Sequence, residues 1–128
     1  MAETITLEEL TATIPTSGYL SPAVKLGGKK IVGIKPPTGT GAFEADTAAL
    51  LFHVSTDDTT YSILRDVDGT VRYATVAEDN TYGHMDLPPS EHASYTSVKI
   101  GAYQSDKSTA VTQTGNRAIK LIVEKVTG

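Results

Sequence analysis

Cysteine and tryptophan are both absent from the 128 residues, and phenylalanine occurs only twice. Without cysteine, the chain forms no disulfide, thiolate metal site or thiol nucleophile, and its redox compartment cannot be inferred. Because aromatic residues make up 6%, the core must consist mainly of Val, Ile, Leu and Ala. Packing or assembly with other proteins must then supply any resistance to harsh conditions.

Basic residues are outnumbered by acidic ones. Lys and Arg total 11 against 15 Asp and Glu, and the formal net charge is −4. A protein that mainly grips phosphate backbones needs clustered basic side chains, so we expect no direct nucleic-acid partner. No run approaches the roughly 20 apolar residues that span a bilayer, and the acidic start lacks the features of a secretory signal. We therefore expect a soluble protein made in the cytoplasm, with no membrane partner.

Residues branched at Cβ are abundant. Thr, Val and Ile number 19, 10 and 8, and their branching favours extended backbone. Turn signals recur at roughly 8 to 12 residues, the spacing typical of sandwiches, and no helical crossovers separate the apolar segments. The sequence therefore predicts a single all-β domain, an antiparallel β-sandwich (jelly-roll-like) of about eight strands. Its topology stays open.

Several segments have recognisable strand patterns. The most apolar run, 48–55, predicts a central buried strand with Phe52 in the core. Segments 61–65 and 70–76 alternate around Asp68-Gly69, which predicts a hairpin. Further strands are expected at 84–87, at 95–100, and from 119 nearly to the end of the sequence at 128.

A second hairpin is expected near the start of the domain. In the segment 20–26, the apolar residues Leu20, Val24 and Leu26 all stand at even-numbered positions, as in a strand with one buried face. Pro22 is typical of an edge strand. Residues 30–35 follow after Gly27-Gly28, with Val32 and Ile34 sharing a face. We assign residues 1–19 to an N-terminal arm or peripheral strand and 20–128 to the sandwich.

Two metal hypotheses are weak. His84 and His92, with nearby acids, could ligate a divalent ion, but two prolines interrupt the segment and the spacing is poor. Asp66-x-Asp68-Gly69 suggests calcium, but the downstream ligands of a calcium loop are missing and a turn explains the same residues. His53 directly follows Phe52 in the predicted strand, so its side chain should point to the other face of that strand or into a subunit contact. We predict no metal site and no cofactor.

Catalytic motifs are also lacking. Ser, His and Asp are all present, but no Gly-x-Ser-x-Gly elbow presents a nucleophile, and the glycine pairs precede no helix that would cradle a phosphate. We predict no enzyme and no catalytic residue. A carbohydrate-binding module remains an alternative, because sandwiches bind sugars with exposed aromatic rings. The candidates are Tyr19, Tyr61, Tyr73, Tyr82, Tyr95 and Tyr103.

An ordered set of short motifs runs from Leu20 to Leu121. Its members are Leu20-Ser21-x-Ala23-Val24-x-Leu26-Gly27-Gly28, Ile31-Val32-Gly33-Ile34 with Pro37, Ala49-Leu50-x-Phe52-x-Val54-Ser55, Asp57, Tyr61, Leu64, Asp66-x-Asp68-Gly69, Val98-Lys99-Ile100 and Asn116-Arg117-x-Ile119-x-Leu121. In these motifs the chain resembles small structural proteins encoded by tailed bacteriophages. It departs from their pattern at Asp58, Tyr61 and Arg65, where Gly, Phe and Tyr are common.

The resemblance implies a virion component without catalysis or cofactor. The leading hypothesis is a capsid decoration (cement) protein on the head exterior that binds the major capsid protein or other virion proteins. We expect it to be made in the host cytoplasm and to form a homo-oligomer. A neck or tail adaptor or fibre-base subunit is the alternative. We expect the contacts on the arm and on the loops 38–47 and 105–114. The candidate interface residues are Thr4, Ile5, Leu7, Leu10, Thr40, Phe43, Tyr103 and Thr112.

Overall fold

The computed structural model describes residues 4–27, 29–35, 37, 43–65, 68–75, 85–86 and 95–127. These residues form nine strands and contain no helix. The strands are β1 (Thr4–Ile14), β2 (Val24–Lys25), β3 (Lys30–Lys35), β4 (Ala49–Ser55), β5 (Ser62–Ile63), β6 (Tyr73–Thr75), β7 (Met85–Asp86), β8 (Ser97–Tyr103) and β9 (Arg117–Thr127). Within this part of the chain, no helix is long and apolar enough to cross a membrane.

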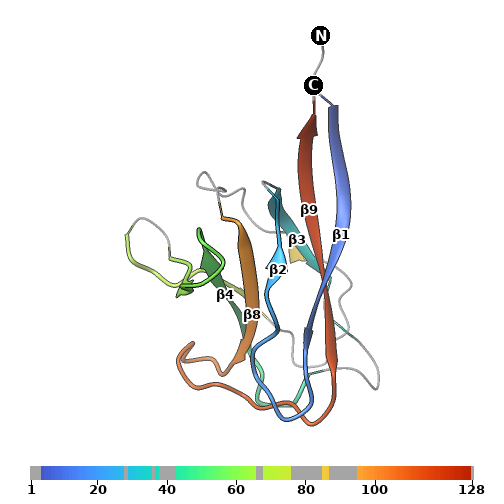
Figure 1. Ribbon diagram of the computed structural model, residues 1–128. Coiled ribbons are helices and arrows are strands. Elements are labelled where there is room, and N and C mark those ends of the chain that lie inside the picture. The colour runs from blue at the N-terminus through green and yellow to red at the C-terminus, as the bar shows by residue number, and fades with distance from the viewer. Residues whose placement is uncertain are drawn as a thin grey trace.

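The strands form two antiparallel sheets that face each other (Figure 1). One sheet has the order β1-β9-β3-β7, and the other has the order β2-β8-β4-β5, with β6 also paired to β4. A single apolar cluster draws side chains from both sheets, among them Ile34, Ile100 and Leu121. The predicted all-β antiparallel sandwich is therefore confirmed.

Strand β4 is buried on both of its faces. Leu50 and Phe52 belong to the core between the sheets, whereas Ala49 and Leu51 join Tyr103 in a second cluster on the outer face of the five-stranded sheet. Phe52 is 2% exposed, as predicted. A strand covered on both sides needs an uninterrupted apolar run, which explains why 48–55 lacks polar alternation.

The predicted hairpin between 20–26 and 30–35 is wrong. β2 pairs with β8 in one sheet, while β3 pairs with β9 and β7 in the other. The chain crosses between the sheets after Leu26, whose amide donates to Thr96 O at 2.9 Å, and it turns at Gly27 with φ of 58°. An alternating segment followed by a glycine turn has the same sequence pattern in two cases. The next strand can pair with the previous one, or it can join the opposite sheet.

The alternation expected over 30–35 is interrupted within β3. The register of β3 against β9 shifts between Ile31 and Gly33, so that Ile31 aligns with Val123 and Ile34 with Leu121. Both isoleucines consequently pack against the core. This β-bulge adds one residue to β3, so Ile31 and Ile34 face the same side although one stands at an odd and the other at an even position.

The hairpin predicted around Asp68-Gly69 forms at its closed end only. Arg65 and Val71 make an antiparallel bridge, and the amide of Arg72 donates to Leu64 O at 3.0 Å. Beyond that bridge, β5 and β6 do not pair with each other, because both pair with β4. The remaining predicted strands, at 84–87, at 95–100 and from 119 nearly to 128, correspond to β7, β8 and β9.

Candidate interaction surface

Strand β1 occupies an edge of the four-stranded sheet. It pairs with β9 over its whole length, from Thr4 opposite Thr127 to Ile14 opposite Arg117. Inside the sandwich, Leu10, Ala12 and Ile14 contribute to the core at every second position, and this alternation fixes the register. On the other side of β1, the described residues supply no further strand. Among the described residues this backbone edge is therefore unpaired, and it can accept an additional strand.

One end of the β1–β9 ladder extends beyond the rest of the sheet. The third strand, β3, reaches β9 only as far as the pair Lys30–Glu124, so residues 4–6 and 125–127 pair only with each other in the described structure. Figure 1 shows β1 and β9 side by side, rising past the other labelled strands. We call residues 4–7 and 124–127 the ribbon tip. A two-stranded ribbon is marginal in water without further contacts.

The ribbon tip presents an apolar side chain to solvent. Leu7 is 63% exposed and is the most exposed large hydrophobic residue among those described. It aligns with Glu124 of β9. Isolated exposed leucines are common, but this one lies on an unpaired strand edge. The two features together indicate a contact surface.

Charges near the ribbon tip are mostly acidic on β1. The Lys29 ammonium contacts Glu8 Oε2 at 2.7 Å. Glu9 is exposed and forms no ion pair with the described residues. Further along, Lys120 donates to the Thr11 hydroxyl at 2.9 Å. Glu9 is thus available to a basic partner.

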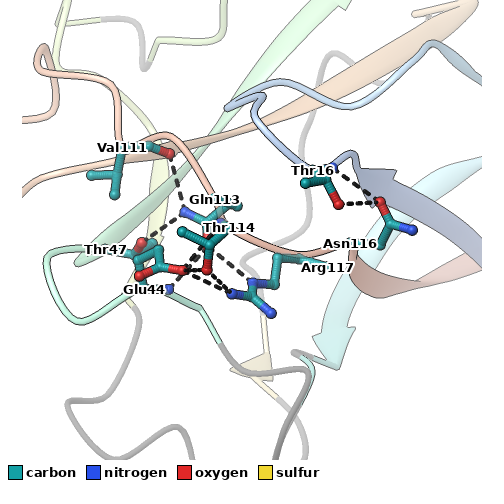
Figure 2. A network of polar contacts seen from close by, with 8 residues as sticks. All are labelled: Thr16, Glu44, Thr47, Val111, Gln113, Thr114, Asn116 and Arg117. Carbon is teal, nitrogen blue, oxygen red and sulfur yellow. Dashed lines mark hydrogen bonds and ion pairs between the residues drawn. The ribbon is translucent and has the colours of Figure 1, made fainter.

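A polar network fixes the opposite end of the sandwich (Figure 2). The side chain of Gln113 is fully buried. Its carbonyl oxygen accepts from the Glu44 amide at 3.0 Å and from Arg117 Nε at 3.2 Å, while its amide nitrogen donates to Thr47 Oγ1 and Val111 O, both at 3.0 Å. All four hydrogen-bonding positions of the amide are therefore filled.

Glu44 and Arg117 complete this network. Arg117 Nη2 lies 3.0 Å from Glu44 Oε1, and the Thr114 amide and hydroxyl donate to the same oxygen. These bonds from Thr114, followed by Arg117, lower the pKa of Glu44. Beside the network, Asn116 Oδ1 accepts from the Thr16 amide and hydroxyl, as Figure 2 shows. Hydrogen bonds thus connect the loop at Glu44 and the loop at Gln113 to the start of β9, and they connect the turn after β1 to the residue that precedes β9.

The loop 105–114 is also ordered by its own hydrogen bonds. Asp106 accepts from the Thr109 hydroxyl and from the amides of Ser108 and Thr109, which lowers the pKa of Asp106 to about 2. The Lys107 ammonium lies 4.2 Å from the centre of the Tyr73 ring. The loop is therefore connected to the outer face of the five-stranded sheet.

The structure separates the residues that we expected to form an interface. Thr4, Ile5, Leu7 and Leu10 lie on β1, with Leu10 half-buried against the core. Phe43 is 5% exposed and belongs to the core, whereas Thr112 is exposed in its loop. Tyr103 is 6% exposed, and Thr40 lies outside the described residues. The β1 residues are thus the group that the structure brings together.

Tyr103 and His53 meet on the outer face of the five-stranded sheet. His53 Nε2 and Tyr103 Oη are 3.0 Å apart, and the rings stack with centroids at 6.0 Å. The position of His53 on the second face of β4 is as predicted. Sequence reasoning missed Gly101, whose lack of a side chain makes room for the Tyr103 ring. A glycine in the middle of an alternating strand is the signal that could have identified it.

Most of the tyrosines proposed as sugar platforms have partners within the chain. The Tyr61 hydroxyl is 2.7 Å from Ser97 Oγ, and the Lys99 ammonium lies 4.4 Å from the centre of the Tyr61 ring. Tyr19 packs edge-on against Tyr103 with centroids at 5.8 Å. Tyr95 packs against the core, and Tyr82 lies outside the described residues. No row of freely stacked rings is seen among the described tyrosines.

Most residues of the two metal hypotheses lie outside the described part of the chain. His84, His92 and Asp66 fall outside it. Asp68 Oδ1 accepts from the Thr70 amide at 2.9 Å, as in an ordinary turn. No group of three or more His, Cys, Asp or Glu that could hold a metal is found among the described residues.

Comparisons of the chain with protein-family models, curated proteins and solved structures gave no match.

Proposed function

We propose that this chain is a bacteriophage virion structural protein, a capsid decoration (cement) protein that binds the outside of the assembled head and stabilises it. The observation that carries the proposal is the ribbon tip, where an unpaired strand edge and the exposed Leu7 lie together. The motif resemblance to tailed-phage structural proteins supplies the class of partner. A protein that binds the assembled head and not its free subunits stabilises the head by mass action.

The organisation of the rest of the molecule supports this role. The Gln113–Arg117–Glu44 network holds the base of the β1–β9 ladder. The body that carries the ribbon tip is therefore rigid at its base, so the loss of conformational freedom on binding is confined to the tip itself. Catalysis has no part in the proposal.

Binding to purified heads tests the proposed function. Heads of the encoding phage that lack this protein are incubated with increasing amounts of the chain, and bound copies are counted after sedimentation. We expect saturable occupancy, no uptake by heads already carrying the protein, and a higher disruption temperature for occupied heads. Absence of binding at concentrations on the order of 10 μM, where an interface of about −7 kcal/mol would be half-saturated, would overturn the proposal.

The neck or tail alternative is distinguished by the same assay. Isolated tails replace heads under identical conditions. Saturable binding to tails, with none to heads, would reassign the chain to a tail adaptor or fibre-base subunit.

A further inference from the structure

We propose that the open edge of β1 at the ribbon tip receives an extended segment of the shell protein as an additional β-strand. In this arrangement an apolar side chain of the segment covers Leu7 and a basic side chain pairs with Glu9. The inference rests on the proposed function and specifies the chemistry of the partner. Strand addition obtains affinity from main-chain hydrogen bonds and specificity from alternate side chains.

The geometry of β1 defines the pattern that the partner must present. Leu7 and Glu9 are two positions apart, so they lie on the same face of the strand. This face is opposite the one through which Leu10 and Ala12 contact the core. A partner strand hydrogen-bonded to β1 would place its own alternate residues beside Leu7 and Glu9. The expected segment therefore has an apolar and a basic residue separated by one position.

The charges around Leu7 favour a basic partner. The first 24 residues contain three Glu and neither Lys nor Arg. Glu8 is engaged by Lys29 at 2.7 Å, whereas Glu9 is exposed and forms no ion pair with the described residues. Glu124 lies across the ladder from Leu7. A basic side chain arriving at this edge meets the exposed Glu9 carboxylate, whereas Glu124 is aligned with Lys30 of β3 and Lys120 donates to Thr11.

The same charges disfavour a second copy of the chain at this edge. Two β1 strands would bring two sets of acidic residues to one interface without a basic residue from either strand. Like charges on facing strands are destabilising. The charges accordingly favour a basic extended segment of a different protein, which the proposed function identifies with the shell protein.

Charge reversal at Glu9 tests the pairing. Affinity for heads is measured for the wild-type chain, for Glu9→Lys and for Lys35→Glu, which reverses an exposed charge at the end of β3 that is remote from the ribbon tip and outside both expected contact loops. We expect Glu9→Lys to weaken binding by about 10-fold at low salt and by less at high salt, and Lys35→Glu to bind within about 2-fold of wild type. Leu7→Thr, at a 63% exposed position, should also weaken binding without unfolding the chain.

A photoreactive benzophenone amino acid at position 7 tests the identity of the partner. On heads, irradiation should attach this position to a shell-protein segment that carries an apolar and a basic residue two positions apart. Attachment to a second copy of this chain, or wild-type affinity of Glu9→Lys, would overturn the inference. If the wild-type chain does not bind heads at all, the proposed function fails together with the inference. If it binds and the variants are unaffected, only the inference fails.

Discussion

Gly101 lies in the middle of β8 at a position where a side chain has no room. A Cβ there would be 2.8 Å from Tyr103 Cε1 and 3.2 Å from His53 Nε2. Tyr103 is therefore held close to the backbone, within 3.0 Å of His53. Position 101 therefore needs glycine because the neighbouring side chains leave no space for a Cβ atom, and not because the backbone has an unusual conformation there.

We expect Gly101→Ala to lower the free energy of unfolding by about 1–3 kcal/mol, because the Tyr103 ring must move to admit the methyl group. Urea denaturation measures the change. In a Tyr103→Ala background the penalty should largely disappear, since the clash is removed. An equal penalty in both backgrounds would show that the clash with Tyr103 is not its cause.

The environment of His53 makes stability depend on pH. Burial, and then the nearby Lys99, lower the pKa of His53 in the folded chain. Below the unfolded pKa of about 6.5, the unfolded state binds more protons at this residue than the folded state does. The free energy of unfolding should therefore fall as the pH drops from about 6.5 toward the folded pKa.

Urea denaturation between pH 8 and pH 5 measures this dependence. His53→Gln should remove the part of the slope that His53 contributes, and the same substitution at His84 serves as the control. An unchanged slope in His53→Gln would contradict the assignment.

At the scale of elements, the sequence predicts strands better than their partners. Period-two alternation located β8 and β9, and the apolar run located β4, because burial imposes these patterns locally. The same patterns cannot tell which sheet a strand joins, which is why the crossing after Leu26 was mistaken for a hairpin. The bulge in β3 was missed although Gly33 lies at the register shift, because a glycine inside a strand marks either a bulge or a close contact and does not say which side chains change face.

The candidate surface was only partly predictable. The sequence drew attention to residues 4–10, but the exposure of Leu7 and the length of the ribbon tip depend on where β3 ends against β9. Phe43 appeared to lie in an exposed loop because its neighbours are small and polar. Burial in the core shows that one aromatic side chain can anchor such a loop.

The network at Gln113 connects two loops to the ends of β1 and β9. We expect Gln113→Leu to lower the free energy of unfolding by about 2–4 kcal/mol, because the Glu44 amide and Val111 carbonyl lose buried partners. Thermal denaturation measures the loss, with Thr112→Leu at the neighbouring exposed position as the control. Equal effects of the two substitutions would show that the network is not what stabilises this end.

For the whole molecule, stability and binding are assigned to different regions. The core between the sheets and the Gln113 network stabilise the body, while the ribbon tip has few tertiary contacts and an open edge. Substitutions in the ribbon tip should therefore change affinity for heads with little change in unfolding, and substitutions in the network should do the reverse. This separation follows from the end of β3 at the pair Lys30–Glu124.

Cryo-electron microscopy of heads saturated with the chain tests the central claim most directly. The proposal predicts density for the sandwich on the outside of the shell, with β1 hydrogen-bonded to an extended segment of the shell protein and Leu7 covered. Density confined to the tail, or a sandwich bound to the head through another face with the β1 edge open to solvent, would contradict it.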